Sequence, residues 1–207
     1  TFTVPYGPPP LGATEPRLHS ANADGFHSAS VAKGPVVENC LFEGQGDDAI
    51  AIHGTYSLVT SAKSSSDTMI VSPKFEMNMQ VGDDTRLLDA GNYGLKGTAK
   101  ITAIKEVEPP TGEQLTAVTA LWERYKADVH GRKFYELTLD KPIESDTGDL
   151  ISSFGRSGAG YVVRNNTIRN HRARGILAKA GAGLIENNTV DNTNIAGIVL
   201  GPEISIW

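Results

Sequence analysis

Residues 36–54 read VVENCLFEGQGDDAIAIHG, and two later segments of the chain align with this stretch without a gap. They are VVRNNTIRNHRARGILAKA from Val162 and LIENNTVDNTNIAGIVLG from Leu184. Each segment holds short apolar runs separated by Asn, Gly and Asp, a pattern typical of short strands joined by turns. One such unit could not bury its apolar face alone, so neighbouring units must stack. The repetition therefore predicts an all-β solenoid built from stacked coils.

An asparagine recurs at the same place in each aligned segment, as Asn39, Asn165 and Asn187. An Asn side chain can bond the backbone or the Asn of the neighbouring coil, and Asn tolerates the left-handed backbone conformation of tight turns. We expect this recurring asparagine to hold the turns of the stack in place.

The repeat pattern stops after Gly54 and resumes at Gly160. The residues between contain four runs with alternating apolar positions, which is typical of strands: 81–90, 97–108, 133–143 and 148–154. They also contain one amphipathic run typical of a helix, at 115–129. The sequence thus predicts coils in residues 1–56, a small inserted β-barrel-like domain in 57–159, and a continuation of the coils in 160–207. Because both ends of the chain read as strands and no Met opens it, we expect a piece of a longer protein.

Composition narrows the class of partner. The net charge is -5, the sequence pI is about 5.5, and no stripe of basic residues is present, which argues against nucleic acid or an anionic membrane as partner. No apolar run approaches the roughly 20 residues that a membrane span needs. Cys40 is the one cysteine, so it cannot form a disulfide within the chain, and we read it as a small core residue. No cofactor or metal is expected.

The acidic residues carry the functional signal. Asp24 and Asp48 stand 24 residues apart, and each is followed by a small and then an apolar residue. Strands in adjacent coils lie about 4.8 Å apart, so the two carboxylates should face each other at about 5 Å, and like charges at that distance push one pKa upward. Asp47, one residue earlier, should point elsewhere. Such stacked acids can hold and activate water, but their register alone does not separate an inverting glycosidase, with acids about 6.5–9.5 Å apart, from a retaining one at about 5–5.5 Å.

The motifs NADGFH at 22–27, GDDAIAIHG at 46–54 and RARGIL at 172–177 resemble those of the right-handed parallel β-helix glycoside hydrolases. The likeness is strongest to the family-110 exo-α-1,3-galactosidases and weaker to the polygalacturonases. It implies a right-handed parallel β-helix interrupted by a small β-domain, and an inverting hydrolase that removes terminal α-linked galactose from oligo- or polysaccharides. It also implies that Asp47 is the general acid and that Asp24 and Asp48 position and deprotonate water. Asn-Ala-Asp in place of Asn-Thr-Asp, and the lack of Gly-His-Gly, argue against pectin.

Six further side chains are candidate sugar-binding groups because the repeat places them around or beside the acids: His27, His53, Arg174, Lys179, Glu203 and Trp207. Imidazole, ammonium and guanidinium groups can bond sugar hydroxyls, and arginine can also neutralise neighbouring acids. An indole ring offers a flat apolar face to a sugar. A purely structural or solvated role stays open for each of these residues.

Two other functions fit the same residues. In a polysaccharide lyase the three carboxylates would hold Ca²⁺, and Arg174 or Lys179 would abstract a proton from a uronic acid. A non-catalytic carbohydrate-binding β-helix would bind sugar without turnover. For all three functions the partner is a carbohydrate, and we expect an extracellular or periplasmic location.

Overall fold

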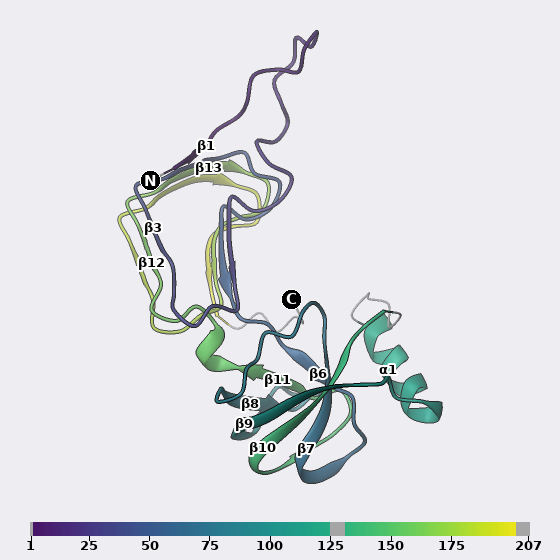
Figure 1. Ribbon diagram of the computed structural model, residues 1–207. Helices are drawn as coiled ribbons and strands as arrows, with labels where there is room; N and C mark the ends of the chain where they lie inside the picture. Colours follow the sequence, from purple (N-terminus) through teal and green to yellow (C-terminus); the bar gives the residue numbers. More distant parts are fainter. Residues whose placement is uncertain (1, 125–130, 202–207) are drawn as a thin grey trace. The chain divides into compact units, whose positions relative to one another are not determined.

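The computed structural model describes residues 2–124 and 131–201 (Figure 1). These residues divide into two compact units. Residues 2–54 and 156–201 form the first, which we call the sheet unit, and Thr55–Gly155 form the second, the barrel unit. Two of the candidate sugar-binding residues, Glu203 and Trp207, lie outside the described residues.

The sheet unit consists of three small parallel sheets, each built from strands that lie far apart in the sequence. Their strand orders are β1 (Thr3–Val4), β4 (Leu41–Glu43), β13 (Thr167–His171), β16 (Thr189–Thr193); β15 (Leu184–Glu186), β12 (Val162–Arg164), β3 (Val36–Glu38); and β17 (Ala196–Leu200), β14 (Arg174–Ala178), β5 (Ile50–His53), β2 (Phe26–Ala29). Val162 pairs with Val36 on one side and with Leu184 on the other. The three aligned segments therefore lie side by side in the register of the alignment (Figure 1).

The predicted right-handed parallel β-helix is nevertheless wrong for this chain. The described residues form parallel sheets of only three or four strands, and the barrel unit is a closed antiparallel barrel, so no single long solenoid exists. The physical reason lies in the extent of the repetition. The stacking is limited to the three aligned segments and the short strands β1 and β2. Residues 55–155 instead alternate apolar and polar positions between turns and close on themselves, without adding further parallel strands.

Two adjacent asparagine positions stabilise these turns in different ways. Asn39, Asn165 and Asn187 have φ angles of 54°, 55° and 53°, the left-handed region that Asn enters more readily than most residues. The recurring asparagine thus serves the turn through its backbone.

Asn166, the next residue along, makes the side-chain bonds between stacked segments. It is 1% exposed, and its Nδ2 donates to the Val37 carbonyl at 3.0 Å and to Asn188 Oδ1 at 2.9 Å. Its Oδ1 accepts from the Cys40 backbone N–H at 3.0 Å. Cys40 occupies the corresponding position of the first segment, where it is buried in the apolar core of the sheet unit with Phe42.

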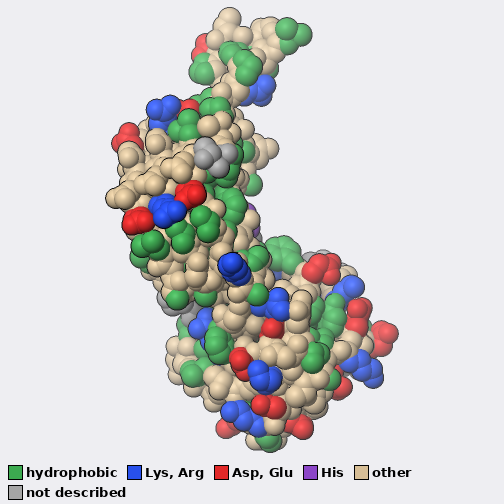
Figure 2. Space-filling model, turned by 60° about the vertical axis from the view of Figure 1, so that its left-hand side comes forward, with side chains coloured by type: hydrophobic (Ala, Val, Ile, Leu, Met, Phe, Trp, Pro, Cys, Tyr) green, Lys and Arg blue, Asp and Glu red, His purple; other side chains and the backbone are tan. Residues whose placement is uncertain are grey.

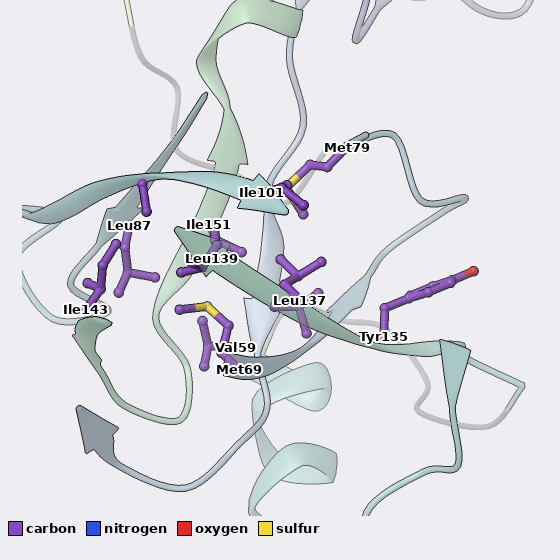
Figure 3. Close-up of a cluster of buried hydrophobic side chains, with 12 residues drawn as sticks. Val59, Met69, Met79, Leu87, Ile101, Tyr135, Leu137, Leu139, Ile143 and Ile151 are labelled. Atoms are coloured by element: carbon purple, nitrogen blue, oxygen red, sulfur yellow. The ribbon is translucent and has the colours of Figure 1, made fainter. Parts of the chain in front are cut away.

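The barrel unit closes six antiparallel strands around one apolar core. In barrel order these are β10 (Phe134–Ser145), β7 (Ser64–Pro73), β6 (Ser57–Val59), β11 (Leu150–Ser153), β8 (Asp84–Leu88) and β9 (Leu95–Val107). Figure 3 shows side chains such as Leu137, Leu139 and Ile151 meeting in this core. The helix α1 (Gly112–Arg124) packs Val118 and Trp122, both 0% exposed, into a second cluster of the same unit. A short 3-10 turn, η1 (Phe154–Arg156), leads back into the sheet unit.

The surface of the described residues shows no large basic patch on the face drawn in Figure 2, in line with the net charge of -5. Acidic and basic side chains are interspersed on the face in Figure 2. Within residues 2–124 and 131–201, no helix is long and apolar enough to span a bilayer.

Asn166→Ala should lower the free energy of unfolding by at least about 2 kcal/mol. The substitution leaves the buried Cys40 N–H without its acceptor, at about 1–3 kcal/mol, and it also removes the bonds of the Asn166 amide to the Val37 carbonyl and to Asn188 Oδ1. Chemical denaturation monitored by circular dichroism measures the loss. The matched control is Asn165→Gly at the adjacent exposed position with φ 55°, where glycine fits the backbone and the change should stay within about 1 kcal/mol. Equal losses in the two variants would contradict this account of the turn.

Candidate active site

Parallel pairing of β2 and β5 places Asp24 beside Asp48. Phe26 pairs with Ile50, and the Gly25 N–H donates to the Asp48 carbonyl at 3.0 Å, so the loops that lead into both strands run in register. Gly25 permits this approach, because a Cβ there would lie 2.5 Å from the Phe42 ring and 2.8 Å from the Ala49 carbonyl. The short Asp-Gly-Phe sequence is therefore what brings the first acid against the second.

Each stacked acid also bonds the backbone of the next segment. Asp24 Oδ1 accepts from the Asp48 N–H at 3.1 Å. Asp48 Oδ1 accepts from the Arg174 N–H at 3.1 Å and from Arg174 Nε at 2.7 Å. Asp24 is half-buried and the Asp48 side chain is only 3% exposed, so both carboxylates are held in fixed positions.

Asp47 joins the same cluster. One carboxylate oxygen from each of Asp24, Asp47 and Asp48 lies within 4.8 Å of the other two. The sequence predicts that Asp47 points elsewhere, yet its oxygen lies in this cluster, and its side chain is the exposed one of the three. Three oxygen donors of this kind suit a hard cation such as Ca²⁺. Arg174 already places a positive charge on Asp48, so we assign no metal to the cluster.

The two histidines form a chain of contacts that ends on Asp24. His27 Nδ1 lies 3.2 Å from Asp24 Oδ2, and His27 Nε2 lies 2.7 Å from His53 Nε2. His53 Nδ1 lies 2.8 Å from the Gly54 carbonyl. The His27 side chain is 52% exposed, whereas His53 is buried.

Burial shifts the pKa values of Asp24 and His53 in opposite directions. Burial raises the pKa of Asp24, as do the charges of Asp47 and Asp48, while the charge of His27 and the Asp48 N–H lower it. Burial lowers the pKa of His53, the hydrogen bond to Gly54 raises it, and the charges of His27 and Lys179 lower it again. Asp24 thus holds a proton more readily than a free aspartate, and His53 is held neutral.

The structure brings most of the predicted site residues together. Arg174 is bonded to Asp48, and Lys179 directly follows β14, where its N–H donates to the Ile52 carbonyl at 2.9 Å. This bond places Lys179 beside His53, whose pKa its charge affects. For Glu203 and Trp207 the predicted sugar-binding role is neither supported nor opposed, since both lie outside the described residues.

The sequence analysis did not single out two buried polar residues near the loop that carries Asp47 and Asp48. Gln45 and His171 are buried at 0% and 2% exposure just before the acidic and basic turns of their segments. Gln45 Nε2 donates to the Val4 carbonyl and to Ser20 Oγ, and burial lowers the pKa of His171. The alignment contains the signal, because it superposes these two polar residues at a position that faces the core.

Known proteins similar to this chain are galactosidases. The chain is 30% identical over 95% of its length to alpha-1,3-galactosidase B of Parabacteroides distasonis, and 29% identical over 92% to alpha-1,3-galactosidase B of Akkermansia muciniphila. It is 26% identical over 92% to alpha-1,3-galactosidase A of Peterkaempfera griseoplana. The chain spans 31%, 22% and 26% of the lengths of these relatives. No protein-family model matches it. The resemblance to α-1,3-galactosidases that the motifs indicate is confirmed.

Asp24→Asn should raise the melting temperature at about pH 7. A raised pKa in the folded protein contributes stability below the ordinary value of 3.8, and this contribution is lost as the pH rises through the raised value. Ionised Asp24 is therefore unfavourable at neutral pH, whereas an amide cannot ionise and can still accept from the Asp48 N–H. Thermal unfolding at a series of pH values should show the gain shrinking towards about pH 4.

The control for this experiment is Asp191→Asn, an exposed acid of β16, which should leave the melting temperature nearly unchanged. A lower melting temperature for Asp24→Asn at neutral pH would contradict the proposed cost of ionising Asp24.

Proposed function

We propose that this chain carries the active site of a glycosidase that removes terminal α-linked galactose from oligo- or polysaccharides. The observation that carries the proposal is the meeting of three carboxylates within 4.8 Å at the paired entries to β2 and β5. The names of the relatives supply the sugar and the α-1,3 linkage. An extracellular or periplasmic location, where such glycans are met, belongs to the same proposal.

The exposure of the three acids suggests a division of roles. Asp47 is exposed and can reach the glycosidic oxygen of a bound substrate, so it serves as the general acid that protonates the leaving group. Asp24 and Asp48 are fixed by backbone amides and less exposed. Together they hold the attacking water and take up its proton.

An inverting course is part of this proposal, and the way in which these two acids are held supports it. A retaining enzyme needs a carboxylate that attacks the anomeric carbon. Both oxygens of Asp24 and one of Asp48 already have partners, and Asp48 is buried, so neither can attack without breaking those bonds. Water between them can attack instead. The carboxylate oxygens lie within 4.8 Å of one another, which is closer to the about 5–5.5 Å of retaining enzymes than to the about 6.5–9.5 Å usual for inversion. The proposal therefore requires Asp47 to turn outward to admit the sugar.

The same carboxylates favour a calcium-dependent lyase as the second candidate, because three clustered oxygens suit Ca²⁺. A lyase also needs a free base, and Arg174 Nε donates to Asp48 at 2.7 Å. Calcium-dependent formation of an unsaturated product that absorbs ultraviolet light would identify a lyase. Activity that persists in a chelator, with no such product, would identify the glycosidase.

Asp47→Asn should reduce hydrolysis of an α-1,3-linked galactobiose by about 10²–10⁴-fold, because the amide cannot protonate the leaving oxygen. Proton NMR of the first sugar released by the unaltered chain should show β-galactose before mutarotation. Asp67→Asn, at an exposed acid in the barrel unit, is the matched control and should leave the rate unchanged. Release of α-galactose first, or full activity of Asp47→Asn, would refute these roles.

A further inference from the structure

We propose that His53 is a positioning residue and not a sugar ligand: it holds His27 as a proton donor towards Asp24, so that each stacked acid has its own cation. The sequence offers both histidines as candidate sugar-binding groups, with a structural role left open. The new assignment rests on the proposed function for its effect on turnover, but the placement of the protons can be measured without any turnover.

The first step is the tautomer of His53. The Gly54 carbonyl can only accept a hydrogen bond, so His53 Nδ1, at 2.8 Å from it, carries a proton. His53 is 6% exposed, and its burial opposes a charged ring. A neutral ring with a proton on Nδ1 has an unprotonated Nε2, so His53 presents an acceptor to His27.

The second step is the protonation of His27. Its Nε2 lies 2.7 Å from the accepting Nε2 of His53 and must therefore donate. Its Nδ1 lies 3.2 Å from Asp24 Oδ2, and two bare acceptors would repel each other there. A proton on either atom removes this conflict. Because the proposed function needs Asp24 ionised as a base, we place the proton on Nδ1, which makes the ring an imidazolium. The ring is 52% exposed, so the cation keeps part of its hydration while it faces the acids.

The third step is the balance of charge in the cluster. Asp48 is paired with the Arg174 guanidinium, and Asp24 is paired with the His27 imidazolium. Three carboxylates and two cations leave Asp47 as the acid without a cation of its own among these pairs. Asp47, the proposed general acid, thus faces two carboxylates, Asp24 and Asp48, whose charges are already balanced by His27 and Arg174. This balance lowers the repulsion between the carboxylates around the water site.

The charged and titratable groups that face the His27–Asp24 pair come from two neighbouring segments. They are Asp47, Asp48 and His53 from β5 and the loop before it, Arg174 from β14, and Lys179 directly after β14. The His27 charge and the Asp48 N–H both lower the pKa of Asp24. Without the His27 cation, Asp24 would take up a proton at higher pH and could no longer accept one from water.

Nitrogen NMR of the full chain with ¹⁵N-labelled histidine tests the proton positions directly, and single substitutions assign the signals. At the pH of maximal activity we expect His53 as the neutral tautomer protonated at Nδ1, and His27 with a proton on both ring nitrogens. A His53 ring protonated at Nε2, or a His27 ring that carries a proton on one nitrogen alone, would overturn the proposal.

Kinetics on the α-galactoside then separates positioning from sugar binding. His53→Phe removes the acceptor and should lower kcat by at least about tenfold, leave KM within about twofold, and move the acidic limb of the pH profile to higher pH. His53→Gln is the matched control, because its Oε1 can replace the accepting nitrogen, and it should restore most of the rate and the original limb.

A sugar ligand would give a raised KM and an unmoved pH profile in both variants, and that outcome would refute the inference. If His53→Phe does not fold, His27→Gln tests the same claim, since it keeps a polar donor but lacks the charge and should also move the acidic limb to higher pH. An inactive unaltered chain would contradict the proposed function alone, and the NMR result would still decide the placement of the protons.

Discussion

The hydrogen bond from the Asp48 N–H to Asp24 Oδ1 is the interaction on which the site depends. The same pattern recurs one segment later, where Asp48 Oδ1 accepts from the Arg174 N–H. In both cases a carboxylate of one segment accepts from a backbone N–H of the next. The bonds that fix the register of the parallel sheet are therefore also the bonds that bring the acids together.

This arrangement has an energetic cost that the fold offsets elsewhere. Half-burying Asp24 beside two other acids raises its pKa, which means that its ionised form is unfavourable in the folded protein. The sheet unit compensates through buried amide bonds such as those of Asn166 and through an apolar core around Phe42 and Ile50. Such a conflict between local stability and a cluster of charges is typical of functional sites.

Part of this structure could be read from the sequence. Matching Val36, Val162 and Leu184 fixes which residues pair across the sheets, and the spacing of Asp24 and Asp48 brings those acids into contact. The extent of the stacking could not be read, since a repeat pattern does not say where parallel strands stop. The strands β6 and β7 were not predicted, and the first residues of β7 are Ser-rich and lack the apolar alternation that marks a strand.

The finer features of the site depend on side-chain rotamers and shared protons, which no spacing specifies. The contact between His27 Nε2 and His53 Nε2 requires both rings to turn towards each other, although the alignment only places them on adjacent strands. Likewise the direction of Asp47 follows from the turn before β5, and the alternation of side chains along a strand does not extend into such a turn. Arg174 was correctly placed beside Asp48, because both follow from the same register.

A crystal structure of the Asp47→Asn variant with an α-1,3-linked galactobiose bound tests the central claim most directly. The account predicts the leaving oxygen within hydrogen-bond distance of residue 47, about 2.6–3.2 Å, and a water held by Asp24 and Asp48 on the opposite face of the anomeric carbon. A sugar bound away from these carboxylates, or Asp24 and Asp48 well over about 10 Å apart in the complex, would contradict it.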